Sequence, residues 1–397
     1  MISVKQALEI INNQPLPLGF EEIPIHLAVG RILAVDVLAD RDAPPFDRVT
    51  MDGVAIQAAH FKPGFAYQIA GTQAAGGVPQ SIKDPSHCLE VMTGAMLPMG
   101  ADCVIPYEQV TIRDGYATLQ IDAVAPYLNI HRKGMDTIMG NTLIPKGSRL
   151  SAGKIGVMAA VGVSKATVAC LPKVIVCSTG DELIPIEKEP LPHQIRNSNA
   201  SMLQAALNHW GIRADSIHLP DEKSALSESL AKLKESYDIW MFSGAVSKGK
   251  FDYLPEVLQE LGMNSLIHGV AQRPGKPFLF GAFDHSIVFG FPGNPASTLI
   301  CFHTFFTPWL ATQQGSAVDS MVAELDADIV FKKPLTYHLL VSIRHEGQRV
   351  IASPVANSGS GDLIHLGAAD GFVSLPPDTD TFSKGQMFPL TRWSNVW

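Results

Sequence analysis

Hydrophobic and polar positions between residues 173 and 314 follow two alternating patterns. Short apolar runs rich in β-branched residues predict buried strands, and each run ends in a loop of Gly, Ser or Pro residues; they lie at 173–177, 238–242 and 286–289. Apolar residues at helical spacing predict helices over 198–209, 222–233, 254–261 and 296–310. Strands that alternate with helices predict βαβ units, and hence a parallel sheet in a three-layer α/β domain.

The flanking segments carry other patterns. An amphipathic helix is predicted over 4–12, and Gly-rich breaks separate short alternating runs between 65 and 130, which indicates a β-rich module. A weakly polar stretch at 155–160 predicts a buried helix, and short runs after residue 326 predict a small barrel-like β domain. We therefore expect a multidomain α/β protein with an N-terminal mixed domain (1–45 and 145–170), an inserted β-rich domain (46–144), the α/β domain (171–320) and a C-terminal β domain (325–397).

Composition narrows the functional class. The chain has 397 residues, of which 46% are hydrophobic and 17% charged, so it has ample material for packed cores. A net charge of −8 argues against a nucleic-acid partner, which normally requires a basic face. The 5 cysteines are odd in number and lack metal-binding spacing, which favours free thiols in the cytoplasm. The longest uncharged stretch, 285–318, is broken by prolines and does not suit a membrane span.

The loop after the first strand of the α/β segment combines hydroxyls, a glycine and acids. Ser178, Thr179, Gly180, Asp181 and Glu182 follow one another directly. Carboxylates beside a phosphate site suit a bound Mg²⁺, because hard cations take oxygen ligands. An alternative of equal weight is that Asp181 only caps a turn or helix.

The loop after the second strand has the composition of an anion-binding nest. Ser243, Gly244, Ser247 and Lys248 supply hydroxyls, flexible backbone and a positive charge, but the spacing does not fit a P-loop. Asp252 follows and is placed to bind a metal or to orient water; its alternative role is a helix first-turn Asp.

A basic cluster stands out in this acidic chain. Arg273 and Lys276 lie between prolines that hold the segment extended, so both side chains can present fixed charge to an anion. The loop after the third strand offers further hydrogen-bond donors. It contains Pro292, Gly293 and Asn294, and Ser297 follows in the first turn of a helix. The donors are Ser297 Oγ and the free backbone N–H groups of that turn. A plain N-cap role for Ser297 is nearly as good an account.

Taken together, these segments resemble the molybdopterin molybdenumtransferase family, the MoeA proteins of bacteria, which are related to gephyrin and to the plant E-domain enzymes. The likeness covers nearly the whole chain, and seven pieces match in family order; they are 44–53, 92–102, 132–136, 178–183, 243–252, 273–277 and 292–297.

The resemblance implies an enzyme that inserts molybdenum from molybdate into adenylylated molybdopterin and releases AMP with the help of Mg²⁺. It also implies a homodimer formed through the N-terminal domain, with Asp52, Thr93 and Asp136 reaching the site from the partner subunit. Contact with a molybdopterin adenylyltransferase is expected as well.

The resemblance also implies a role for each matched residue. The acids that handle the metal and phosphoanhydride cleavage are Asp181, Glu182 and Asp252, with metal ligation by Asp181 and Asp252. Substrate binding falls to Ser178, Thr179, Gly180, Ser243, Gly244, Ser247 and Lys248. The molybdate pocket takes His268, Arg273, Lys276, Pro292, Gly293, Asn294 and Ser297.

Three segments depart from the usual family pattern. His268 stands where a Lys or Arg is usual, so a fixed positive charge becomes one that is mostly absent at neutral pH. Ala245 and Lys248 alter the second loop, and 48–50 differ from the usual Asn-Ser-Ala. The alternative functions are a non-catalytic scaffold, or another nucleotide or pterin hydrolase on the same α/β domain.

Overall fold

A computed structural model describes residues 1–244, 253–317, 321–356 and 359–393. The chain forms two compact units, which we describe separately. The first unit comprises Met1–Ala34, Gly147–Ser151 and Ala166–Trp397, and the second comprises Val35–Lys146 and Ala152–Lys165. The four-domain division expected from the sequence stays a prediction.

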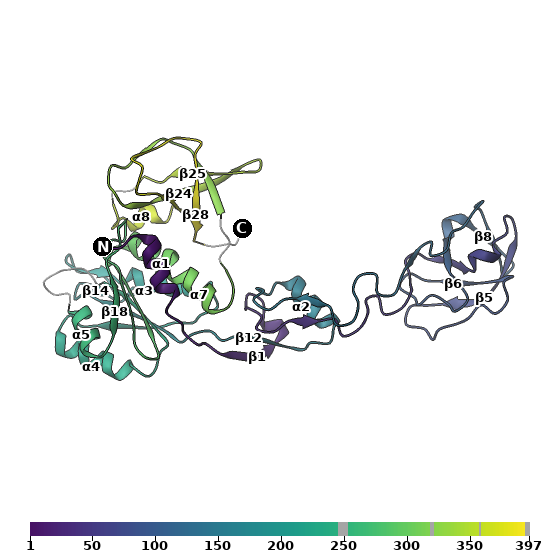
Figure 1. The fold of residues 1–397 in the computed structure, drawn as a ribbon, viewed down its shortest axis with the longest axis horizontal. Helices are drawn as coiled ribbons and strands as arrows, with labels where there is room; N and C mark the ends of the chain where they lie inside the picture. Colours follow the sequence, from purple (N-terminus) through teal and green to yellow (C-terminus); the bar gives the residue numbers. More distant parts are fainter. Residues whose placement is uncertain (245–252, 318–320, 357–358, 394–397) are drawn as a thin grey trace. The chain divides into compact units, whose positions relative to one another are not determined.

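The first unit contains a 6-stranded sheet that carries the loops singled out above (Figure 1). In spatial order its strands are β16 (Asp215–Leu219), β13 (Val174–Thr179), β17 (Ile239–Ser243), β21 (Ile287–Phe291), β20 (Leu279–Ala282) and β18 (Asn264–His268). The first four are parallel to one another, β20 runs in the opposite direction, and β18, which pairs antiparallel with β20, runs in the same direction as the first four. The sheet is therefore mixed and not wholly parallel as predicted. The physical reason is that β20 and β21 are joined by a tight turn closed by the Phe283 N–H to Ser286 O hydrogen bond, and such turns join antiparallel strands.

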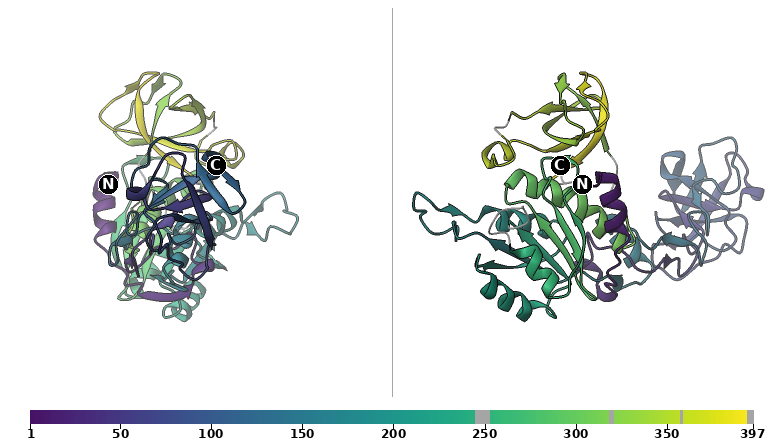
Figure 2. Two further views of the ribbon diagram at one scale, coloured as in Figure 1. Left: turned by 90° about the vertical axis from the view of Figure 1, so that its right-hand side faces the viewer. Right: turned by 60° about the vertical axis from the view of Figure 1, so that its left-hand side comes forward.

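Helices cover both faces of this sheet. Alternate residues of β13 divide between two apolar cores, with Val174 and Val176 on one side and Ile175 and Cys177 on the other. The first core is covered by α1 (Val4–Asn12), α3 (Ser198–Asn208), α6 (Pro295–Cys301), η4 (Phe302–Phe306) and α7 (Thr307–Gln313). The second is covered by α4 (Lys223–Leu233) and α5 (Leu254–Glu260). Figure 2 shows α1 beside the green helices of η4 and α7. The helix predicted over 296–310 is thus interrupted by the π-helical turn η4.

The C-terminal part of the first unit is a small closed β-sheet, as the sequence predicted. Its strands are β19 (Gln272–Arg273), β22 (Met321–Leu325), β24 (Thr336–Glu346), β25 (Arg349–Pro354), β26 (Gly371–Leu375) and β28 (Met387–Arg392). Pairing of β24 with both β25 and β26, and of β28 with both β22 and β26, closes the barrel around a core that includes Val341 and Val373. The strand pair β23 (Ile329–Val330) and β27 (Thr381–Phe382) and the short helix α8 (Leu363–Leu366) complete this part.

The second unit is built mainly from a 6-stranded sheet. Its strands, in spatial order, are β7 (Cys103–Pro106), β4 (Gly53–Ile56), β6 (His87–Val91), β5 (Ala66–Gln73), β9 (Tyr116–Leu119) and β8 (Val110–Arg113). Two short pairs join it, β2 (Val37–Leu38) with β11 (Thr142–Ile144) and β3 (Arg48–Val49) with β10 (Ile130–His131).

Helix α2 (Ala152–Ala160) is less buried than the sequence predicted. Met158 is its buried residue and Val157 is 39% exposed. An apolar sequence allows a helix to be buried, but the helix is buried only on the faces that other elements cover. The remaining elements are β1 (Phe20–Pro24), η1 (Ile25–Leu27), η2 (Ala58–His60), η3 (Tyr107–Gln109), β12 (Lys165–Ala169), β14 (Leu183–Ile184) and β15 (Ile195–Arg196). None of the helices in the described ranges has the length and apolar character needed to cross a bilayer.

Candidate active site

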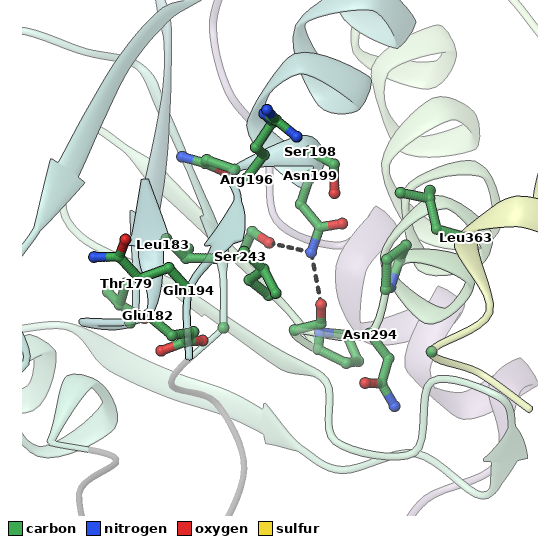
Figure 3. A pocket seen from close by; sticks show the side chains of 18 of the residues that line it. Thr179, Glu182, Leu183, Gln194, Arg196, Ser198, Asn199, Ser243, Asn294 and Leu363 are labelled. Carbon is green, nitrogen blue, oxygen red and sulfur yellow. Dashed lines mark hydrogen bonds between the residues drawn. The ribbon is translucent and has the colours of Figure 1, made fainter. Parts of the chain in front are cut away.

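Three predicted loops meet at one edge of the α/β sheet. Because β13, β17 and β21 are parallel, the loops that follow them leave at the same edge, where ligands bind in open α/β sheets. There they line a pocket of about 870 Å³, here called the acidic pocket (Figure 3). The predicted residues that line it are Thr179, Gly180, Glu182, Ser243, Gly244, Pro292, Gly293 and Asn294.

Two carboxylates face this acidic pocket. Glu182 follows β13, and Asp221 follows the edge strand β16. The Asp181 backbone N–H donates to Asp221 Oδ2 at 3.3 Å. Burial raises the pKa of the Asp221 carboxyl, this hydrogen bond opposes the rise, and the nearby Asp181 and Glu182 carboxylates add to it. The ionised acids therefore repel one another, and a bound cation would relieve that repulsion.

An asparagine ties the loops together beneath the pocket. Asn199, in the first turn of α3, donates from Nδ2 to Ser243 Oγ at 2.8 Å and to the Gly293 carbonyl oxygen at 2.7 Å (Figure 3). Its side chain is buried, and Oδ1 has no hydrogen-bond partner among the described residues. A buried amide that bridges two loops fixes their spacing, because breaking either bond leaves a polar group unsatisfied.

Ser178 is placed beneath the loop and not at the pocket surface. Its buried hydroxyl accepts a hydrogen bond from Asn197 Nδ2 at 2.7 Å, while Asn197 Oδ1 caps α3 by accepting from the Ala200 N–H. The hydroxyl thus connects the end of β13 to the start of α3. Its contacts are those of a structural residue.

A second pocket of about 470 Å³, the cationic pocket, adjoins the first. Arg273, Lys276 and Ser297 line it as predicted, and Pro277, Pro292 and Asn294 line both pockets. Its opposite wall comes from the C-terminal barrel, with Lys333, Tyr337 and His338. Among the described residues that line it are three cationic side chains and no carboxylate, which suits an oxyanion.

Several predicted residues lie elsewhere. His268 ends the edge strand β18, is exposed, and is not among the residues that line either pocket. It pairs with Leu279 of β20, and its predicted role at the oxyanion site stays a prediction. Asp181 meets the acidic cluster through its backbone N–H. Ser247, Lys248 and Asp252 lie outside the described residues.

Asp52, Thr93 and Asp136 belong to the second unit. Asp52 Oδ1 accepts hydrogen bonds from both the backbone N–H and the hydroxyl of Thr93, each at 2.7 Å, and the hydroxyl bond is the larger cause of the lowered pKa of Asp52. Asp136 Oδ1 lies 2.8 Å from His131 Nε2, and Arg48 Nη2 lies 2.9 Å from His131 Nδ1. Because Arg48 can only donate, His131 Nδ1 accepts and Nε2 carries the hydrogen that is donated to Asp136.

The lining residues that sequence reasoning missed include Arg196, Asn199, Asp221 and Lys333. Asp221 had a usable signal, since it follows the strand β16 as Glu182 follows β13. That strand lies at the sheet edge with three of its five residues exposed, so its apolar pattern was weak. Lys333 had no local signal, because only the barrel closure brings it to the Arg273 loop.

Family models match the chain from end to end. Residues 2–162 match the MoeA N-terminal region (domain I and II), residues 175–312 match a probable molybdopterin binding domain, and residues 322–393 match the MoeA C-terminal region (domain IV). Fold and pockets together therefore define a multidomain protein of the molybdopterin-binding class.

Full-length relatives specify the family. A molybdopterin molybdenumtransferase from Synechocystis sp. is 40% identical, with 99% of this chain and 100% of the relative aligned. Two crystal structures of molybdopterin biosynthesis MoeA proteins from Pyrococcus horikoshii are 32% and 28% identical, with TM-scores of 0.85 and 0.83, and cover 100% and 99% of this chain and 100% of each structure. The chain belongs to the molybdopterin molybdenumtransferase (MoeA) family, whose members are transferases of molybdenum cofactor biosynthesis. The resemblance inferred from the sequence motifs is thereby confirmed.

Proposed function

We propose that the chain uses its two adjoining pockets to join molybdate to adenylylated molybdopterin and to release AMP. The observation that carries the proposal is that an acid-lined pocket and a cationic pocket share Pro277, Pro292 and Asn294 as their common wall. One substrate in the acidic pocket can thus present its dithiolene sulfurs toward an oxyanion in the other. The acidic pocket's volume of about 870 Å³ lies within the range of small-molecule sites.

The acidic pocket suits Mg²⁺ held jointly with a phosphate. In the described ranges of the chain, there is no group of three or more His, Cys, Asp or Glu side chains arranged to hold a metal. Mg²⁺ usually takes only one or two carboxylates together with substrate phosphates, and Glu182 and Asp221 supply that number. When bound, the ion neutralises the negative charge that develops on the phosphates as the phosphoanhydride bond breaks. Glu182 and Asp221 would hold it in place.

The remaining residues have roles in binding and orientation. Arg273, Lys276 and Lys333 attract the molybdate dianion, and Ser297 Oγ can donate to it. Thr179, Gly180, Ser243 and Gly244 form the wall against which the phosphates and pterin of the substrate lie.

A homodimer completes this proposal. Asp52 of the partner subunit, Thr93 of the partner subunit and Asp136 of the partner subunit reach the acidic pocket. The hydrogen bonds within the second unit keep Asp52 and Asp136 oriented for that contact. Contact with a molybdopterin adenylyltransferase and a cytoplasmic location stay predictions.

The test is Asp221→Asn in the full-length protein. Purified protein is incubated with adenylylated molybdopterin, Mg²⁺ and molybdate, and AMP and active cofactor are followed together. Loss of a ligand that stabilises developing charge should lower the rate of AMP release about 100-fold. The matched control is Asp215→Asn at the other end of β16, where the carboxylate accepts from Tyr237 Oη at 2.8 Å and faces neither pocket.

The wild-type result separates the alternatives. AMP without cofactor would indicate a hydrolase, and neither product would indicate a scaffold. Equal rates for the wild type and Asp221→Asn would remove the acidic pocket from the reaction.

A further inference from the structure

The loop that carries Arg273 and Lys276 is hydrogen bonded into the C-terminal barrel. Strand β19 enters the loop and pairs in parallel with β24, with Gln272 opposite Thr336 and Arg273 opposite Tyr337. The Thr336 N–H also donates to the Ala271 carbonyl oxygen at 3.1 Å. The backbone that leads into the cationic pocket is therefore a strand of the barrel sheet.

A series of hydrogen bonds between buried side chains also links the barrel to the Arg273–Lys276 loop. Gln272 Nε2 lies 2.9 Å from the Gly275 carbonyl oxygen, Gln272 Oε1 lies 3.1 Å from His338 Nε2, and His338 Nδ1 lies 3.0 Å from Ser374 Oγ. The Gly275 carbonyl only accepts, so the amide nitrogen of Gln272 faces it and Oε1 faces the imidazole. His338 Nε2 consequently carries the hydrogen, and Nδ1 accepts from the Ser374 hydroxyl.

Both central members of this hydrogen-bonded network are buried where they line the cationic pocket. Gln272 is 0% and His338 is 2% exposed, and the imidazole ring packs edge-to-face on Phe372 at 5.0 Å. Burial lowers the pKa of the His338 imidazole to about 3, so the ring is neutral near pH 7. Its hydrogen-bonding direction is therefore fixed, and a lost partner leaves a buried polar group unsatisfied.

The loop backbone rests directly against the amide of this chain. Gly275 has a positive φ of +90°, and a Cβ there would lie 2.7 Å from Gln272 Nε2 and 2.5 Å from Cys301 Sγ. Gln272 Nε2 itself lies 3.3 Å from that sulfur. A shift of the Gln272 amide would thus displace the backbone between Arg273 and Lys276.

We propose that His338 is a positioning residue of the oxyanion site, which acts through Gln272 to hold Arg273 and Lys276 facing one bound dianion. The inference rests on the proposed function, in which the cationic pocket takes molybdate. Affinity for a dianion that contacts two cations depends on their spacing, whereas binding in the acidic pocket depends on the other loops. Loss of these hydrogen bonds should therefore weaken the binding of molybdate and leave the binding of adenylylated molybdopterin unchanged.

The test compares His338→Phe with His338→Gln in the full-length protein. Phe fills the space and removes both hydrogen bonds, while Gln retains a donor toward Gln272. We expect His338→Phe to raise the molybdate concentration for half-maximal activity about tenfold, in line with the loss of one buried hydrogen bond. The requirement for adenylylated molybdopterin and the rate at saturating molybdate should not change, and His338→Gln should recover most of the loss. Calorimetric titration with molybdate alone should show the same order of affinities.

A second buried histidine supplies the matched control. His303 is 8% exposed, contacts the Trp393 ring at 5.2 Å, and is not a lining residue of either pocket. His303→Phe should leave the molybdate requirement unchanged. If His338→Phe does not fold, Ser374→Ala tests the outer end of the same chain with an expected rise of about threefold.

Two outcomes would overturn the inference. One is a folded His338→Phe protein with the wild-type molybdate affinity. The other is a loss of specificity, in which His338→Phe raises the requirement for both substrates equally or His303→Phe raises the molybdate requirement as much as His338→Phe does. Lys276→Ala separates this inference from the proposed function. If Lys276→Ala leaves the molybdate requirement unaltered, the cationic pocket is not the molybdate site; if only Lys276→Ala raises it, the pocket stands and the role of His338 falls.

Discussion

Lys333 shows how a single charge can reach a site without any local motif. The chain carries a net charge of −8, and the cationic pocket gathers Arg273, Lys276 and Lys333 on its walls. In the sequence, His268 stands where the family usually carries a fixed positive charge, and Lys248 adds a charge to the second loop. The structure instead places an extra cation on the loop that leads into β24.

Replacement of Lys333 by Ala should weaken molybdate use specifically. We expect about a fivefold to tenfold rise in the molybdate concentration for half-maximal activity, since a charge-assisted contact to an oxyanion is lost. The effect should shrink as ionic strength rises. Lys332→Ala is the control, because Lys332 is its exposed neighbour and is not a lining residue of either pocket. Equal effects of the two substitutions would remove Lys333 from the site.

Site residues that follow a strong strand were accessible from the sequence, and others were not. Glu182, Ser243 and Gly293 follow buried apolar runs, which fix them at the sheet edge. Asn199 lies in the first turn of α3 and does not follow a buried strand directly. Its hydrogen bonds to Ser243 and Gly293 join positions that are 44 and 94 residues apart in the sequence. No local pattern encodes contacts of that range.

At the scale of elements, the Arg273–Lys276 loop depends on a glycine that no other residue can replace without cost. Gly275 combines the left-handed backbone region with close contacts to Gln272 and Cys301. An added methyl group there meets both a conformational penalty and a steric one.

Gly275→Ala should lower the free energy of unfolding of the first unit by about 2–4 kcal/mol, as the sum of backbone and overpacking penalties. It should also raise the molybdate requirement. Gly315→Ala isolates the backbone contribution, because Gly315 has a φ of +72° and a Cβ there would meet nothing within 4 Å. We expect about 1–2 kcal/mol for that control. Urea unfolding curves measure both values, and similar losses would show that the loop has room for a side chain.

The mixed sheet marks the limit of strand prediction at this scale. The apolar runs of β13, β17 and β21 placed the strands correctly, but strand direction depends on the connection. The turn between β20 and β21 is too short for the helical crossover that a parallel pair requires, so β20 runs against its neighbours β21 and β18.

At the scale of the whole chain, two buried imidazoles couple folding to pH. Burial lowers the pKa of both His303 and His338 to about 3, whereas the unfolded chain has an imidazole pKa of about 6.5. The unfolded state therefore binds more protons than the folded state between these values. Stability of the first unit is retained above about pH 6.5 and falls as the pH decreases below it.

We expect the slope of the unfolding free energy to reach about 1.4 kcal/mol per pH unit for each imidazole on the acid side of pH 6. Fluorescence of the buried Trp240 and Trp309 follows the transition of the α/β core. His303→Phe and His338→Phe should each reduce the slope between pH 6 and pH 4.5. An unchanged slope in both variants would assign the acid sensitivity to other groups.

Because β19 pairs in parallel with β24, the cationic pocket is built from two domains that are separate in the sequence. A segment that belongs to the α/β domain by position in the chain is held in a sheet whose other strands are encoded beyond residue 321. Grafting residues 321–393 from a homologue onto this protein would therefore alter its preference among tetrahedral oxyanions, although every residue of the Arg273–Lys276 loop stayed the same.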